Sequence, residues 1–108
     1  MKHYDFIIIG AGPAGYTAAI RAAHLKQTVL LCEENLVGGT CLNAGCVPTK
    51  ALIHASQFFH SISKAEQFGV KLEGSYDLSA MNAYKDETVA KLRTGVESLI
   101  KANAIELV

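Results

Sequence analysis

The chain of 108 residues lacks net charge, long hydrophobic runs and any linker rich in proline, glycine or serine. Its ten basic residues balance ten acidic ones without a Lys/Arg cluster, so neither a nucleic-acid partner nor a membrane partner is expected. The first apolar run, Phe6–Ile9, is far shorter than the roughly 20 residues of a membrane span and too short for a signal-peptide core. These absences predict one cytoplasmic domain without repeats.

What the chain does contain is a hydrophobic content of 50%, enough for a folded core. A globular chain of this length is expected to bury roughly 60–70% of its unfolded surface. Residues 4–9 carry this short apolar run, which ends at a glycine, and residues 28–32 are predicted to form a second strand. Between them, an alanine-rich helix is predicted from Pro13 to about Lys26. This βαβ pattern predicts an α/β fold with parallel strands.

The second half of the chain predicts two more helices and the start of a strand. The first helix covers about residues 51–65 and ends near Gly69. The second runs from an N-cap at Ser79 to about Asn103, with Gly95 as its weak point. Its apolar face contains Val89, Leu92, Val96, Leu99 and Ile100. Residues 104–108 look like the beginning of a strand.

The link between the first strand and the first helix carries a glycine fingerprint, Gly10-Ala11-Gly12-Pro13-Ala14-Gly15. Gly10 allows a tight turn, Gly12 lets backbone amides approach a pyrophosphate, and Gly15 lets the helix pack closely on the strand. Phosphates would then lie at the helix N-terminus. Glu33, at the end of the second strand, is the expected ribose partner ahead of Glu34. The alternatives are a plain tight turn and a glutamate that only solvates the strand end.

Four residues separate Cys41 from Cys46, shortly after this fingerprint. A metal site with His54 or His60 is one alternative, but the second pair of ligands that zinc requires is missing. A structural disulfide is another, although so short a loop restricts the unfolded chain little. A redox-active pair fits best beside a nucleotide cofactor.

Pro48 predicts that a helix begins just after Cys46, and a helix N-terminus stabilises a thiolate. Cys46 is therefore the better thiolate of the pair. Cys32 lies within the second strand, where it is expected to act as a small buried hydrophobic residue.

The fingerprint, Glu33 and the segment Gly38–Lys50 together resemble the N-terminal FAD-binding region of the class I pyridine nucleotide-disulfide oxidoreductases. The resemblance covers essentially the whole chain. Leu42 and the run Lys50-Ala51-Leu52 are more similar to the dihydrolipoamide dehydrogenase branch than to the glutathione or mercuric reductase branches. Thr49 stands where the family more often has serine.

The resemblance implies a role for each residue of the cysteine segment. Cys41 would exchange with the disulfide substrate, and Cys46 would be held against the flavin as a charge-transfer thiolate. Lys50 would lie near the N5 side of the isoalloxazine, where its charge favours reduced flavin. The remaining implied FAD contacts are Gly10, Gly12, Pro13, Ala14, Gly15, Glu33, Gly38, Gly39 and Thr40.

The implied activity is oxidation of dihydrolipoamide by NAD through FAD and the Cys41/Cys46 disulfide. The implied partners are a second copy in a homodimer and components of a 2-oxo acid dehydrogenase complex. The alternatives are a non-catalytic nucleotide-binding or dithiol module and a related reductase of the glutathione or mercuric type. No metal is expected.

Members of this family are several times longer than 108 residues. Residues 1–108 would form the N-terminal part of an FAD/NAD(P)-binding domain. The NAD-binding and C-terminal interface domains, with their acid-base histidine, are absent from this sequence, so the chain alone is expected to be inactive. Apolar surface is expected where further strands would pack.

Overall fold

The computed structural model describes residues 1–108 and contains a three-stranded parallel sheet in the order β1-β2-β3. The strands are β1 (Phe6–Ile9), β2 (Val29–Cys32) and the short β3 (Glu106–Leu107). Ile9 pairs with Cys32, so β1 and β2 end at the same edge. The parallel βαβ unit confirms the α/β fold expected from the sequence.

Helix α1 (Pro13–His24) connects β1 to β2 and packs on the sheet through small side chains. Ala19 and Ala22 are its buried residues, and alanine at these positions lets the helix lie close to the strands. Pro13 occupies the first turn, where its missing N–H removes no helical hydrogen bond. The helix ends two residues before the expected Lys26, which has a positive φ of 66°.

The cysteine segment contains more helix than the sequence predicted. A short helix, α2 (Gly39–Ala44), carries Cys41, and α3 (Cys46–Lys64) begins at Cys46 itself. The helix predicted over about residues 51–65 therefore starts five residues earlier, at Cys46, in agreement with the helix start predicted from Pro48. Proline at the third helical position leaves the first turn free to form. A 3-10 turn, η1 (Ala65–Phe68), follows and ends at Gly69 as expected.

Helix α4 (Leu78–Ala102) is continuous through Gly95, but its N-cap is Asp77 and not the expected Ser79. The Asp77 Oδ1 accepts hydrogen bonds from the amides of Ser79 and Ala80, at 2.8 and 3.2 Å. The positive end of the helix dipole also stabilises a carboxylate at this position, which explains why aspartate is the N-cap residue.

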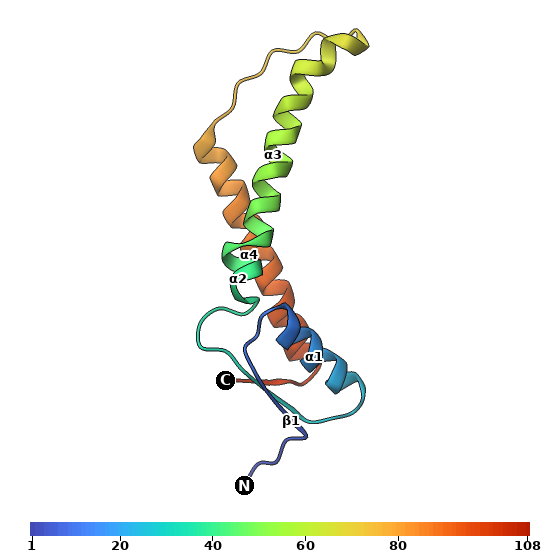
Figure 1. Cartoon of the computed structure of the whole chain (residues 1–108), viewed down its shortest axis with the longest axis vertical. Helices are drawn as coiled ribbons and strands as arrows, with labels where there is room; N and C mark the ends of the chain where they lie inside the picture. The colour runs from blue at the N-terminus through green and yellow to red at the C-terminus, as the bar shows by residue number, and fades with distance from the viewer.

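Helices α3 and α4 pack against each other and extend away from the sheet, and residues 69–77 run back from the far end of α3 to the start of α4 (Figure 1). The molecule measures 68 × 25 × 17 Å, and its radius of gyration of 19.4 Å exceeds the roughly 13 Å of a compact domain this size. No helix combines the length and apolar character needed to cross a membrane.

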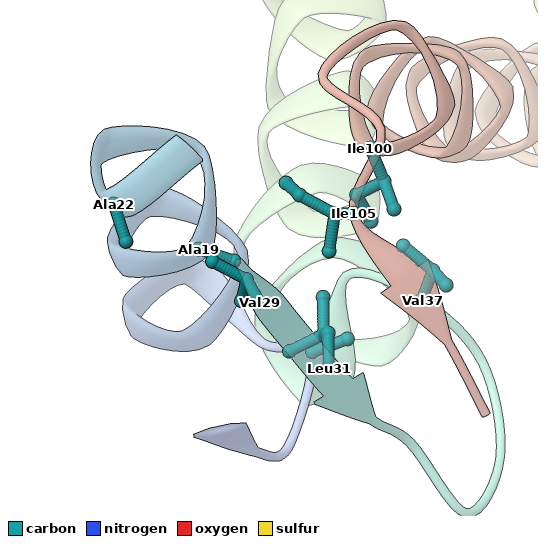
Figure 2. Close-up of a cluster of buried hydrophobic side chains, with 8 residues drawn as sticks. Ala19, Ala22, Val29, Leu31, Val37, Ile100 and Ile105 are labelled. Carbon is teal, nitrogen blue, oxygen red and sulfur yellow. The ribbon is translucent and has the colours of Figure 1, made fainter. Parts of the chain in front are cut away.

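The core is small and lies between the sheet, α1 and the last turn of α4 (Figure 2). Only 12 of 108 residues are buried, and the accessible surface is 7729 Å². An unfolded chain of this mass exposes roughly 17,000 Å², so about half of that surface is buried and the expected 60–70% was wrong. On α4, Val89 and Ile100 are buried, whereas Leu92 and Leu99 of the predicted apolar face are about half exposed.

Candidate nucleotide and dithiol site

A cavity of about 600 Å³ opens at the edge of the sheet where β1 and β2 end. Ligands in open parallel sheets bind beyond the carboxyl ends of the strands, and this volume is typical of small-molecule sites. The cavity is lined by Ile9, Gly10, Gly12, Cys32, Glu33, Glu34, Gly39 and Val108.

The fingerprint shapes the floor of this cavity through close backbone packing. A Cβ atom built on Gly15 would lie 1.8 Å from the carbonyl oxygen of Gly10, so only glycine fits there. Gly15 therefore lies beneath the turn and not in the cavity lining. Pro13 and Ala14 are exposed at the start of α1 and also lie outside the lining.

The N-terminus of α1 opens beside Gly12 without a side-chain cap. Gly12 is the N-cap residue and has extended backbone geometry. Because no side chain accepts from the first-turn amides, these N–H groups and the positive end of the helix dipole are available to an anion. The arrangement suits a phosphate group.

Glu33 has hydrogen-bond partners within the protein that its sequence position does not indicate. Its Oε2 accepts a 2.7 Å hydrogen bond from the amide of Ala11, and its Oε1 accepts a 3.0 Å hydrogen bond from the amide of Asn35. The carboxylate therefore ties the glycine turn to the loop after β2. Each oxygen keeps acceptor capacity for a ribose hydroxyl, and Glu34 is exposed in the same cavity.

The cysteine segment packs directly on the glycine turn. The amide of Gly38 donates to the carbonyl oxygen of Ala11 at 2.8 Å. Gly39 has a positive φ of 62°, and a Cβ atom built on it would lie 2.9 Å from the Cα of Gly12. Two glycines facing each other thus bring the two sequence motifs into backbone contact.

Cys41 and Cys46 form a disulfide, with their Cα atoms 4.7 Å apart. Cys41 lies in α2 and is half-buried, whereas Cys46 is the exposed first residue of α3. The prediction that Cys46 lies at a helix N-terminus is confirmed. This position would favour the Cys46 thiolate once the disulfide is open.

Thr40 and Lys50 lie at the margins of the site. Thr40 is exposed and lines a neighbouring hollow of about 380 Å³ together with Glu33 and Gly39. Lys50 is exposed on α3, four residues after Cys46, and forms no hydrogen bond or ion pair. Its charge is thus one helical turn from the disulfide.

Cys32 lies elsewhere than the sequence predicted, and Asn43 has a role that was not predicted. Cys32 was expected in the core, but it is half-buried and lines the cavity, because it is the last residue of β2 at the open edge of the sheet. Asn43 lies between the two cysteines, and its side chain hydrogen-bonds to backbone carbonyls and to Arg93 of α4. The only feature of the sequence that could have indicated a role for Asn43 is its position inside the cysteine motif.

The two histidines suggested as metal ligands, His54 and His60, are both exposed on α3. No group of three or more His, Cys, Asp or Glu side chains is placed to hold a metal ion.

Curated relatives with similar sequences are dihydrolipoyl dehydrogenases. The one from Thermus scotoductus is 51% identical over 107 residues, which is 99% of this chain and 23% of the relative. Those from Geobacillus stearothermophilus and Staphylococcus aureus are 46% and 48% identical over 105 residues, covering 96% of this chain and 22% of each relative. The chain therefore spans less than a quarter of the length of these relatives.

A solved structure with a similar fold is the Cu(II) complex of the HOCl-induced flavoprotein disulfide reductase RclA from Escherichia coli. It matches with a TM-score of 0.79 and 31% sequence identity, over 100% of this chain and 22% of that chain. The sequence profile described as "Pyridine nucleotide-disulphide oxidoreductase" matches residues 4–108. Nearly the whole chain is covered by this match, and the chain belongs to the pyridine nucleotide-disulphide oxidoreductase family.

Proposed function

We propose that this chain forms the dithiol-bearing part of the FAD site of a flavin-dependent disulfide oxidoreductase of the dihydrolipoyl dehydrogenase type. The observation that carries the proposal is the backbone contact between Gly12 and Gly39. Through it, the helix that bears Cys41 and the turn that would hold a pyrophosphate share one wall of the same cavity. A nucleotide bound there would lie next to the disulfide segment.

The residues present fit FAD. The uncapped N-terminus of α1 offers amides for the pyrophosphate, Glu33 offers acceptors for a ribose, and the cavity has room for part of a nucleotide. Gly10, Gly12, Gly39 and Glu33 would hold the cofactor. Gly15 and Gly38 would shape the turns behind the lining, Pro13 and Ala14 would form the start of α1 beside the pyrophosphate, and Thr40 would lie at the margin of the site. When bound, FAD would supply two-electron transfer between the dithiol and a nicotinamide.

The protein's own contribution is the exchange step at the disulfide. Two substrate thiols lose two electrons and two protons and become a disulfide, while the bond between Cys41 and Cys46 breaks and the two cysteines become thiols. We assign the exchange with substrate to Cys41. Cys46 is at the N-terminus of the 19-residue helix α3, where the helix dipole would stabilise its thiolate once the disulfide is open. Lys50 adds a positive charge one turn later.

The names of the curated relatives support a dihydrolipoyl group as the dithiol substrate. NAD as electron acceptor, a homodimer, association with 2-oxo acid dehydrogenase components and a cytoplasmic location complete the proposal. These are proposals for a protein as long as the relatives, because this chain matches less than a quarter of their length. A chain limited to residues 1–108 is proposed to be inactive by itself.

A related reductase with a different substrate is the second candidate, and the similarity to the disulfide reductase from Escherichia coli favours it. The two candidates differ in the thiol that opens the disulfide. Rapid reduction by dihydrolipoamide, with slow reduction by glutathione at equal thiol concentration, favours the first. The reverse order favours the second.

The test is the visible absorbance spectrum of the chain after mixing with FAD and desalting, before and after anaerobic addition of dihydrolipoamide. We expect retained oxidised flavin and, after reduction, a long-wavelength band from a thiolate beside the flavin. Cys41→Ser should show this band without reductant, because it leaves Cys46 free. Cys46→Ser should retain flavin and never show the band.

Two results would contradict the proposal. A folded chain that retains no flavin would argue against the FAD site. Retained flavin with no band in the wild-type chain or in Cys41→Ser would support the alternative of a non-catalytic nucleotide-binding module.

A further inference from the structure

Asn43 makes four side-chain hydrogen bonds from a position inside the loop that the disulfide closes. Its Nδ2 donates to the carbonyl oxygens of Val37 and Gly39 at 3.0 and 2.9 Å, with a longer contact of 3.5 Å to that of Leu36. Its Oδ1 accepts from the Nη1 of Arg93 at 2.9 Å. The amide therefore ties α2 both to the loop before it and to α4.

Arg93 is half-buried on α4, 50 residues further along the chain. It forms no ion pair, and Asp86, which lines the same hollow of about 420 Å³, is paired with Lys85 at 2.9 Å. The side-chain partner of the guanidinium is the neutral amide of Asn43. A hydrogen bond from a charged donor is stronger than one between neutral groups.

Helix α2 needs such an anchor because it is short and has glycine at both ends. It has six residues, Gly39–Ala44, and is flanked by Gly38 and Gly45. An isolated helix shorter than about 12 residues is marginal in water. While the disulfide is closed, the covalent bond to α3 also holds α2 in place. Once the disulfide opens, only the non-covalent contacts, including those of Asn43, hold α2 in place.

We infer that Arg93 and Asn43 are positioning residues that keep the sulfurs of Cys41 and Cys46 adjacent after the disulfide opens. The inference rests on the proposed function only in that the pair must cycle between disulfide and dithiol. Ordering the open segment raises the effective concentration of one thiol at the other and so favours closure of the disulfide. A contact that stabilised both states equally would leave the redox equilibrium unchanged.

The test is the equilibrium of the 108-residue chain with glutathione buffers. Two glutathione thiols are oxidised to one glutathione disulfide, and their two electrons and two protons convert the Cys41–Cys46 disulfide to two thiols. Acid quenching and thiol counting give the fraction reduced. Arg93→Met should shift this equilibrium toward the dithiol by roughly three- to tenfold. About tenfold, the size of one hydrogen bond to a charged group, is the upper limit, because part of the contact's stabilisation is common to both redox states.

Two variants serve as controls. Lys91→Met removes the same charge from the same helix, but Lys91 pairs only with Glu87 and should behave like the wild-type chain. Arg93→Lys keeps a donor at nearly the same reach and should lie within about twofold of wild type. If circular dichroism shows that Arg93→Met does not fold, Arg93→Gln replaces it, and the same direction of shift is expected.

The outcomes separate this inference from the proposed function. An unchanged equilibrium in folded Arg93→Met, or in Arg93→Gln where it replaces that variant, would overturn the inference, even if the variant melts at a lower temperature in both redox states. A wild-type disulfide that stays closed at every glutathione ratio would instead contradict the redox cycle and the proposed function with it. A shift in Lys91→Met as large as that in Arg93→Met would assign the effect to helix charge and would also overturn the inference.

Discussion

The amide of Ala11 donates a 2.7 Å hydrogen bond to the Oε2 of Glu33. This bond joins the glycine turn to the end of β2, and the other carboxylate oxygen accepts from the amide of Asn35. The turn that would receive a phosphate is thus held in shape by the residue expected to bind the ribose. One carboxylate therefore contributes both to folding and to the shape of the cavity.

Glu33→Ala should lower the free energy of unfolding by about 1–3 kcal/mol, because it leaves the Ala11 amide without its charged acceptor. Urea denaturation measures this loss. Glu34→Ala is the matched control, since Glu34 is exposed and its side chain forms no hydrogen bond, and its effect should stay within about 0.5 kcal/mol. Equal losses in both variants would argue against a structural role for Glu33.

Alanine should have opposite effects at two glycines of the chain. At Gly15 a Cβ atom would lie 1.8 Å from the Gly10 oxygen, so Gly15→Ala should cost about 3 kcal/mol or more and push α1 away from β1. At Gly95, within α4, nothing lies within 4 Å of a Cβ atom, so Gly95→Ala should stabilise the chain by about 0.5–1 kcal/mol. Thermal unfolding of both variants checks the signs, and stabilisation by Gly15→Ala would contradict the close packing.

Removal of the α4 N-cap should distinguish Asp77 from Ser79. Asp77→Ala deprives two amides of their acceptor and should cost about 1 kcal/mol of helix stability. Ser79→Ala should have little effect, because only its backbone amide takes part in the cap. Helix content by circular dichroism during urea titration is the measurement, and the opposite ranking would restore the assignment made from sequence.

The contact between the N-terminal segment and β3 should depend on pH. Hydrogen bonds from Tyr4 and Lys2 hold the pKa of Glu106 below its ordinary value of 4.5. A carboxylate with a lowered pKa contributes stability that is complete above its ordinary pKa and is lost as the pH falls through its folded value. The difference in melting temperature between the wild-type chain and Glu106→Gln should therefore shrink in acid. A difference that stayed constant from neutral pH to about pH 3 would refute this linkage.

The same contact should also weaken in base. The hydrogen bond to Glu106 raises the pKa of Tyr4 above 10.0 and that of Lys2 above 10.5. Groups with raised pKa values contribute stability below their ordinary pKa and lose it as the pH rises through the folded value. Tyr4→Phe should therefore remove part of the decrease in melting temperature above pH 10. If the melting temperature of that variant falls above pH 10 as steeply as that of the wild-type chain, Tyr4 does not contribute to the alkaline loss of stability.

Local signals explain why much of the fold and site could be predicted. The run that ends at Gly10, the proline at α1 and the glycine at position 69 each act within a few residues of their own position. The approach of Cys41 to Cys46 follows from their short separation and the turn between two helices. The errors arose where two neighbours competed, as Asp77 and Ser79 did for one cap, or where exposure depends on distant packing, as at Leu92 and Leu99.

By itself, the sequence determined the parallel βαβ unit, the glycine turn and the cysteine pair beside it, because short-range sterics and backbone hydrogen bonding dictate these features. Only the tertiary structure decided that Gly39 lies against Gly12, that Glu33 holds Ala11 and that Arg93 reaches Asn43 across 50 residues. The physical reason is that such contacts depend on where separate elements pack in space. The local pattern of residues at either end does not encode that placement.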